Sequence, residues 1–292
     1  GDDRKAIAVY RAFLDDPEFL RRESAETLIN IEASLAALLY GQGDFAEAQR
    51  AIERAMLRAR TVLVPNHPTQ IENEIIAASI LLERGDKAGA LALAEPALAK
   101  ARVAFGPDHV LVGTCLRRFA QVLIASERVD EGVAAVEQAI RIFDQRLGRR
   151  SGRSIDARSQ LAEAYRRKNE LERSAKLYAE LLADAEAAYG AAHPMWAQLS
   201  SEHATVLAAL DRADEARALL ERAIPLLADG PPDLLASAKF ELAKLVEADD
   251  HGRAITLASE AEVALGALPS TADKHATVRT WLARHVRRAI AR

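Results

Sequence analysis

The chain has 292 residues, half of them apolar, and a formal net charge of −4; it is long enough for a sizeable core and lacks the strongly basic balance of a general nucleic-acid binder. Its single cysteine excludes an intramolecular disulfide and, with no signal-peptide pattern at the start, favours a cytoplasmic protein. The most apolar stretch, 75–82, is far shorter than a bilayer span, so no membrane insertion is expected.

A 42-residue repeat organises the sequence from its first residue. Turn-like segments begin at positions 1, 43, 85, 127, 169 and 211, and a degraded copy at 250–254 arrives a few residues early. The sixth place of each segment holds a small residue: Ala6, Ala48, Ala90, Gly132, Ser174 and Ala216. Seven residues later come Phe13, Ala55, Ala97, Ala139, Leu181 and Ala223. Because the two sets lie two turns apart on one helical face, they predict close approach of a neighbouring helix.

A second rhythm with the same period marks where helices begin and end. Positions 67, 109 and 193 hold histidine, proline follows at 68 and 194, and Ser151 takes the same place in its repeat. Proline fits a first helical position, where its missing N–H is no loss, while Gly106, Gly148 and Gly190 suit the end of the preceding helix. The histidines lie one repeat apart, too far to share a metal, so we expect them to cap the next helix.

In chain order, the pattern predicts a helix over 1–16 that starts mid-repeat at Gly1 without a partner, then six helix pairs over 25–268. One such pair is expected over 110–125 and 129–147, each helix with apolar residues at i, i+3 and i+4. A basic capping helix over 272–291 follows, with the apolar stripe Val278, Trp281, Leu282 and Val286. No period-2 alternation predicts strands. The expected fold is all-α, a right-handed α-α superhelix forming one domain over 1–292.

These features resemble a tetratricopeptide repeat (TPR): a small residue in the first (A) helix of each pair, a glycine-type turn, and Glu-Ala opening the second (B) helix. The repeat length and the linker Gly190-Ala191-Ala192-His193-Pro194 are similar to kinesin light chains and their bacterial relatives. The resemblance covers residues 1 to about 268. Where that family has paired asparagines, this chain has Arg117-Arg118, Ser159-Gln160 and Ser201-Glu202, so a kinesin-like cargo preference is not expected.

A second resemblance concerns the end of the chain. The segments 254–261 and 281–284 are similar to the ending of bacterial serine/threonine kinases that carry a C-terminal TPR region. This resemblance implies that the chain is the partner-sensing arm of a larger bacterial signalling protein, with a kinase upstream of Gly1. No kinase motif lies within the chain itself.

The residues offer little that indicates catalysis. Cys115 lies in the apolar part of a helix with no nearby histidine or acid, so it is interpreted as core packing. His203 occupies a helix face usually filled by a large apolar residue, so we expect it to pack in the core rather than to act in catalysis. Phosphate-binding, nucleophile-elbow and metal-type motifs are missing from the sequence. We therefore expect a non-enzyme that needs no cofactor.

The resemblance to TPR proteins implies a concave groove lined by the A helices, which would bind a partner protein or peptide. Side chains that can form hydrogen bonds suit an extended peptide, whose backbone needs partners when it leaves water. An ordinary solvated helix face is the alternative interpretation. The polar positions expected in the groove are Arg117, Arg118, Gln121, Ser159, Gln160, Glu163, Arg166, Ser201, Glu202 and Thr205.

Charge adds one hypothesis about the partner. Between positions 141 and 173 there are ten basic and five acidic residues, so an acidic or phosphorylated segment is expected to be attracted to the middle of the chain. The loop 149–154, which replaces the His-Pro linker, could instead be a phosphorylation target at Ser151 or Ser154, or a soluble turn.

Two other functions stay open at this point. One is a ligand-gated regulatory domain that binds a small peptide or metabolite and changes curvature. The other is a homo-oligomerisation module, because the unpaired first helix leaves an apolar side that self-association would cover.

Overall fold

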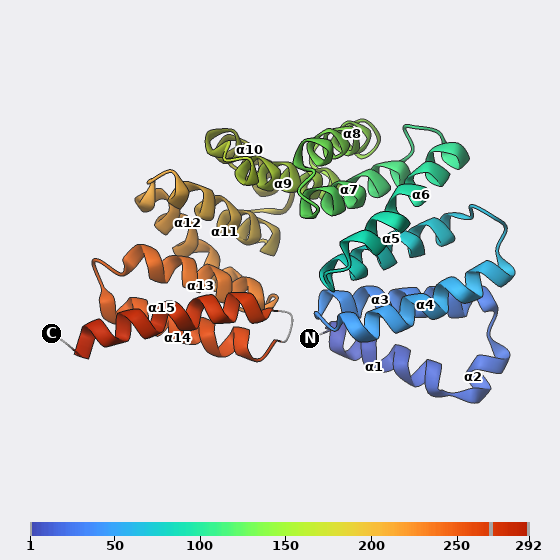
Figure 1. Ribbon diagram of the computed structural model, residues 1–292, viewed down its shortest axis with the longest axis horizontal. Helices are drawn as coiled ribbons and strands as arrows, with labels where there is room; N and C mark the ends of the chain where they lie inside the picture. The colour runs from blue at the N-terminus through green and yellow to red at the C-terminus, as the bar shows by residue number, and fades with distance from the viewer. Residues whose placement is uncertain (1, 269–270, 291–292) are drawn as a thin grey trace. The chain divides into compact units, whose positions relative to one another are not determined.

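The computed structural model describes residues 2–268 and 271–290, and side-chain detail is given for all of these except 2 and 286–290. Within this part the regular elements are helices and no strand occurs (Figure 1). The chain forms two compact units, Gly1–Gly148 and Arg149–Arg292. The expected all-α architecture of helix pairs is therefore confirmed, and each unit is described below by itself.

The first unit has two leading helices and three pairs. Its helices are α1 (Asp2–Asp15), α2 (Pro17–Arg22), α3 (Ala25–Gly41), α4 (Phe45–Val62), α5 (Pro68–Glu83), α6 (Lys87–Phe105), α7 (Val110–Ala125) and α8 (Val129–Leu147). The odd-numbered members of the pairs are the A helices and the even-numbered ones the B helices. The bounds of α7 and α8 coincide with the helices that the sequence predicts over 110–125 and 129–147. The six-residue helix α2 was not predicted.

The second unit has three pairs and a final helix. Its helices are α9 (Gly152–Arg167), α10 (Leu171–Tyr189), α11 (Pro194–Ala209), α12 (Ala213–Leu226), α13 (Pro232–Val246), α14 (His251–Gly266) and α15 (Ala272–Ile290). Helix α15 packs against α14, and Trp281 meets the Phe240 ring edge-on at 5.9 Å. The predicted turn at Gly1, the side chain of Val286 and the end of the capping helix at 291 lie outside the described residues.

The turns within the first five helix pairs share one backbone conformation, which the turn between α13 and α14 lacks. Gly43 and Gly85 have φ of 78° and 85°, and Glu127, Asn169 and Asp211 have φ between 58° and 62° at the same 42-residue spacing. A left-handed residue ends the A helix and turns the chain back on itself. Glycine adopts this conformation without steric cost, whereas the other three residues adopt it at some expense.

The linkers between pairs confirm the expected capping role of the histidines. The Nδ1 atoms of His67, His109 and His193 accept hydrogen bonds from the backbone N–H two residues ahead, at 3.3, 3.1 and 3.1 Å. Ser151 performs the same task with its hydroxyl, which accepts from the N–H of Ser154 at 3.3 Å. Each side chain satisfies one of the donors that a helix N-terminus leaves open.

Small residues allow the helices of a pair to pack closely, as the repeat predicts. A Cβ atom added to Gly132 on α8 would lie 2.5 Å from Cγ1 of Ile124 on α7, closer than real Cβ contacts come. Ala48, Ala90 and Ala216 at the equivalent places are fully buried. Phe13 breaks the series: it is 39% exposed and stacks on Phe19 of α2 at 4.7 Å.

The apolar cores follow the units. One cluster joins α1 with the first two pairs and contains Ile7, Ile29, Leu39 and Ile52. In the second unit, one cluster lies between α9, α10 and α11, a second between α11, α12 and α13, and a third unites α13, α14 and α15. Among the described residues, no helix is long and apolar enough to cross a membrane. The single-domain boundary over 1–292 stays a prediction.

Candidate functional site

A cavity of about 420 Å³ opens in the second unit, and A helices supply most of its walls. Helices α9, α11 and α13 each contribute polar side chains, α15 closes one side, and α10 and α14 add one residue each. The lining residues are Glu163, Arg166, Tyr178, Ser201, Glu202, Thr205, Ser237, Phe240, Glu241, Lys244, Leu265, Lys274, Thr277 and Val278. The volume lies in the range of small-ligand sites.

The cavity is apolar and buried at its floor and charged at its rim. Tyr178, Leu265 and Val278 are each 1% exposed, and Phe240 and Ser201 are nearly as buried. At the opening, the side chains of Arg166, Lys244 and Glu163 are about one-third to two-fifths exposed, and Lys274 is exposed. A group that enters therefore passes charged side chains before it reaches aromatic and aliphatic surface.

Glu202 on α11 is a half-buried carboxylate of this cavity. Its Oε2 accepts a 2.6 Å hydrogen bond from the Ser159 hydroxyl, and its Oε1 accepts a 3.0 Å bond from the Gln198 amide. Burial raises the pKa of Glu202 above its ordinary value, and the nearby charge of Glu163 adds to the rise, although the hydrogen bonds from its neutral neighbours oppose it.

The other charged groups of the cavity are arranged differently. Arg166 forms a two-pronged pair with Glu163 through bonds of 2.6 and 2.7 Å. Burial favours the neutral form of Glu163, but hydrogen bonds from Arg166 and from Arg167 outweigh it and hold the pKa of this carboxyl below its ordinary value. Lys244 pairs with Glu241 at 2.6 Å. Two of the three rim cations thus have a carboxylate partner inside the unit.

Lys274 is the third rim cation. Its ammonium contacts the Ser237 hydroxyl at 3.4 Å, and among the described residues no carboxylate lies within ion-pair distance of it. It projects from α15, the helix outside the repeat.

The structure brings together half of the groove residues that the sequence predicts. Glu163, Arg166, Ser201, Glu202 and Thr205 line the cavity. Ser159 lies behind it, bonded to Glu202, and Gln160 is half-buried next to Ser159 on α9. The remaining three, Arg117, Arg118 and Gln121, are half-buried on α7 in the first unit, where Arg118 donates to the Gln121 side chain at 3.3 Å.

Sequence reasoning missed the contributions of α13 and α15. The residues concerned are Ser237, Phe240, Glu241, Lys244, Lys274 and Thr277. A signal existed for α13. Its buried residues Ala236, Ala243 and Val246 follow Ala197, Ala204 and Leu207 by 39 positions each (236 − 197, 243 − 204 and 246 − 207), so the repeat shortens there. Strict counting by 42 assigns the wrong residues to the cavity, and α15 has no repeat partner from which to align it.

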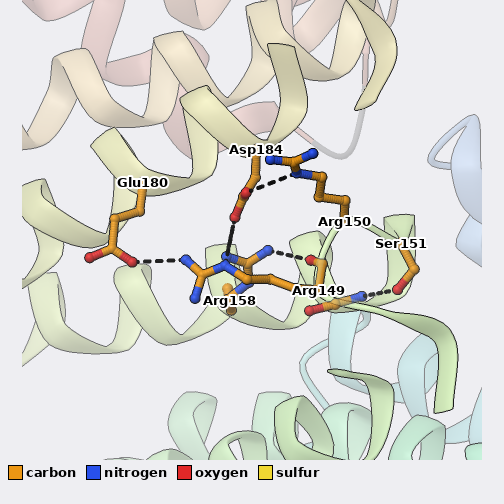
Figure 2. Close-up of polar contacts among 7 residues, drawn as sticks. Arg149, Arg150, Ser151, Arg158, Glu180 and Asp184 are labelled. Carbon is orange, nitrogen blue, oxygen red and sulfur yellow. Dashed lines mark hydrogen bonds and ion pairs between the residues drawn. The ribbon is translucent and has the colours of Figure 1, made fainter. Parts of the chain in front are cut away.

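The basic region 141–173 is less available than the sequence suggests, because many of its cations are paired within the chain. Figure 2 shows Arg149, Arg150 and Arg158 gathered around Asp184 on α10. Arg158 is nearly inaccessible and binds Asp184 at 2.7 Å, and Arg149 also pairs with Glu180 at 2.9 Å. Burial of Asp184 favours its neutral form, but hydrogen bonds from Arg158 and Arg149 outweigh this and lower its pKa.

The same region contains two further ion-pair groups. Lys168 and Arg173 both contact Glu170, and Arg167 binds Glu163 at 3.0 Å. Counting charges over 141–173 therefore overstates the number of cations available to a partner, because Glu180 and Asp184, which pair with three of them, lie just beyond this range. Ser151 is engaged as a helix cap and Ser154 is buried, which leaves little support for phosphorylation of this loop.

The two candidate reactive groups are packed, as expected. Cys115 is fully buried, and burial, aided by Glu72 and Glu74, raises the pKa of its thiol to about 12. His203 is buried against Tyr178, with ring centres 6.0 Å apart, and burial followed by the charge of Arg212 lowers its pKa to about 4. In the described part of the chain, no group of three or more histidine, cysteine or acidic side chains is placed to hold a metal ion.

Comparison with known families finds matches to one family of repeats. The tetratricopeptide repeat family matches three stretches, residues 33–69, 77–111 and 154–194. Two lie in the first unit and one in the second. Each begins within an A helix and ends at the start of the next A helix. The chain therefore contains tetratricopeptide repeats, and its helix pairs have the fold of proteins built from them. No curated protein matches the sequence of this chain.

Solved structures with the same fold include a kinesin light chain from Podosopora anserina with nearly identical TPR-like repeats. It is 20% identical with a TM-score of 0.58, over 71% of this chain and 98% of that one. BtubC (BKLC) from P. vanneervenii is 21% identical with a TM-score of 0.61, over 76% and 90%. A Rap protein complexed with Competence and Sporulation Factor is 15% identical with a TM-score of 0.66, over 97% and 72%. At these identities the likeness is one of fold.

Proposed function

We propose that the chain is a protein-interaction scaffold and that its second unit receives a short extended segment of a partner protein in the cavity between α9, α11, α13 and α15. The single observation that carries this proposal is the convergence of polar side chains from three successive A helices on one opening with a buried apolar floor. Helix pairs that only needed to pack together would leave these positions solvated.

The composition of the cavity suits a peptide segment. An extended backbone presents N–H and C=O groups that need partners once they leave water, and the cavity offers hydroxyl groups on Thr205, Ser237 and Thr277 besides its charges. Phe240, Leu265 and Val278 offer apolar contact to one or two side chains. Sites with a mostly apolar surface and a few placed polar groups are typical of ligand recognition.

A wider role rests on the sequence resemblances. The similarity of the last helices to TPR regions of bacterial kinases supports a partner-sensing arm within a larger signalling protein. The Rap protein of the same fold, solved in complex with Competence and Sporulation Factor, supports a regulatory use of such a scaffold. An acidic or phosphorylated partner has weaker support, because the cations around Asp184 and Glu163 are already paired.

A selection experiment tests the proposal. A random library of short peptides is selected against the full chain and counter-selected against Thr205→Trp, whose indole would fill the cavity. Thr256→Trp is the matched control, since both threonines bond to the carbonyl four residues earlier on a helix, and Thr256 is exposed on α14. We expect peptides that bind the wild type and the control but not Thr205→Trp. Recovery of only those peptides that bind all three proteins equally would refute the cavity as the binding site.

A further inference from the structure

The half-buried carboxylate of Glu202 lacks a partner of opposite charge among the described residues. Its hydrogen-bond donors, Ser159 and Gln198, are both neutral, and within the described residues no lysine, arginine or histidine lies within ion-pair distance of it. Asp184 and Glu163 in the same unit each have two or more basic partners. Carboxylates withdrawn from water are normally compensated by a cation, so Glu202 calls for one.

The hydrogen bonds already made by Glu202 limit what can complete it. An ionised carboxylate offers roughly four acceptor positions, and Ser159 and Gln198 occupy one on each oxygen. About one position is left on each oxygen. A guanidinium group presents a rigid fork that needs two parallel acceptors, whereas an ammonium group is a compact charge that can donate a single bond. An ammonium group can therefore use either remaining position, whereas a guanidinium needs both of them in parallel.

The walls of the cavity fit the stem that would carry such an ammonium group. Phe240, Leu265 and Val278 form apolar surface in the same cavity as Glu202, and all three are at least nine-tenths buried. Lysine side chains commonly lay their four methylene groups along apolar surface while the charged end finds polar partners. A lysine that enters from the rim would bury its stem against these residues and bring its ammonium to Glu202.

We propose that the cavity recognises a lysine side chain of the partner segment, with its ammonium group paired to Glu202 and its stem against Phe240, Leu265 and Val278. This inference rests on the proposed function and names the chemistry of the segment that the cavity takes. It assigns a cation of the partner to the cavity, because Glu202 has no cation of its own among the described residues.

The rim determines which lysines are accepted. Lys244 and Lys274 stand at the opening, and only Lys244 has a carboxylate partner among the described residues. A run of basic residues would bring like charges together at this rim, while an acidic residue beside the inserted lysine would meet Lys274. The preferred segment is therefore a single lysine with acidic neighbours.

A defined peptide tests this inference. The probe is the blocked heptapeptide acetyl-Ala-Ala-Asp-Lys-Asp-Ala-Ala-amide, compared with peptides that carry norleucine, acetyl-lysine or arginine at the centre. Binding to the full chain and to Glu202→Gln is measured by calorimetry. Glu180→Gln is the matched control, since it removes a carboxylate of the same unit that lies outside the cavity and already has its own cation. Thermal unfolding of each variant verifies that it is folded.

We expect the lysine peptide to bind the wild type about tenfold more tightly than the norleucine and acetyl-lysine peptides, with arginine in between. Glu202→Gln should remove this advantage while it leaves the binding of the norleucine peptide unchanged, and Glu180→Gln should retain it. This comparison is a double-mutant cycle, so it isolates the pairing of ammonium and carboxylate from the rest of the contact.

Three outcomes would overturn the inference. In the first, the lysine and norleucine peptides bind equally well. In the second, Glu202→Gln weakens the binding of both peptides equally. In the third, the lysine peptide does not bind, or it binds Thr205→Trp as well as it binds the wild type. The peptide library separates this failure from failure of the proposed function. Library peptides that need an open cavity but contain no lysine would refute the lysine site and leave the scaffold proposal standing, whereas the absence of any such peptides would refute both.

Discussion

Asp184 and Glu202 are carboxylates of the same unit, both half-buried, and their surroundings shift their pKa values in opposite directions. Asp184 is surrounded by Arg149, Arg150 and Arg158, and its pKa is lowered despite its burial. Glu202 is held by neutral donors, and its pKa is raised. The difference shows that burial alone does not decide the role of an acidic residue. The Asp184 cluster is complete and stabilises the fold, whereas the Glu202 site is incomplete and opens to a cavity.

The largest effect is expected from Asp184→Asn. It would leave Arg158, whose side chain is 4% exposed, without its counter-charge, and breaking a buried pair in this way costs about 3–5 kcal/mol of unfolding free energy. Urea unfolding measures the change. The control is Glu180→Gln on the same helix, which removes only a largely exposed contact to Arg149 and should cost less than about 1 kcal/mol. Similar losses in both variants would show that the Asp184 cluster is not a buried structural pair.

The two carboxylates should also respond to acid in opposite ways. Because the folded pKa of Asp184 is lowered, its contribution to stability is present above its unfolded pKa and is lost as the pH falls through the folded value. Because the folded pKa of Glu202 is raised, its ionised form is a cost above that pKa, and the cost disappears as the pH falls through it.

Urea unfolding from about pH 7 to about pH 3 would follow both effects. As the pH falls, the stability difference between wild type and Glu202→Gln should close first, and the difference between wild type and Asp184→Asn should close at a lower pH. The reverse order would contradict the comparison between the two sites.

A smaller effect is expected from Glu202→Gln at neutral pH. The substitution removes a half-buried charge that has no cation beside it among the described residues and keeps a side chain of the same shape, so the free protein should gain about 1 kcal/mol. Thermal unfolding without peptide measures this gain. A variant that is more stable yet binds the lysine peptide less well would separate stability from function, while a marked loss of stability would mean that Glu202 has a structural role.

The smallest effect concerns an acidic residue outside both sites. Glu127 lies in the turn between α7 and α8 with φ of 62°, and its side chain is exposed, so its backbone conformation rather than its charge is at issue. Glu127→Gly should add about 0.5 kcal/mol because glycine adopts this conformation without steric cost. Glu127→Gln is the control and should change little. A gain in the control equal to that of the glycine variant would assign the effect to charge.

The fold could be predicted almost completely from the sequence because each repeat states the same local rules. His109 marks the start of a helix, and Gly106 and Gly148 mark the ends of two others. Because the repeat has a constant length, these boundaries predict those of the other repeats. The period failed where the chain departs from it: α13 follows α11 by 39 positions, and α2 falls between the first helix and the first pair. Left-handed turns at Glu127, Asn169 and Asp211 were predictable from their place in the repeat, although not from residue type.

The candidate site could be predicted only in part, because a cavity depends on neighbours that no single repeat specifies. Ser201, Glu202 and Thr205 were found from their place on an A helix. The absence of a counter-charge at Glu202 and its presence at Asp184 depend on which side chains of adjacent helices meet. Arg158 lies 26 positions before Asp184, and only the packing of α9 on α10 shows that they form a pair.

The shared turn conformation at positions 43, 85, 127, 169 and 211 has a consequence for how such a chain can change in length. Because the backbone enters and leaves each of these turns in the same way, a cut at one turn and a cut at the next expose matching ends, 42 residues apart. A whole B helix with the following A helix could be removed or duplicated between them with no new loop to design. Each of these turns is thus a position at which repeats could be recombined. A glutamate, asparagine or aspartate there adopts the same left-handed backbone conformation as glycine.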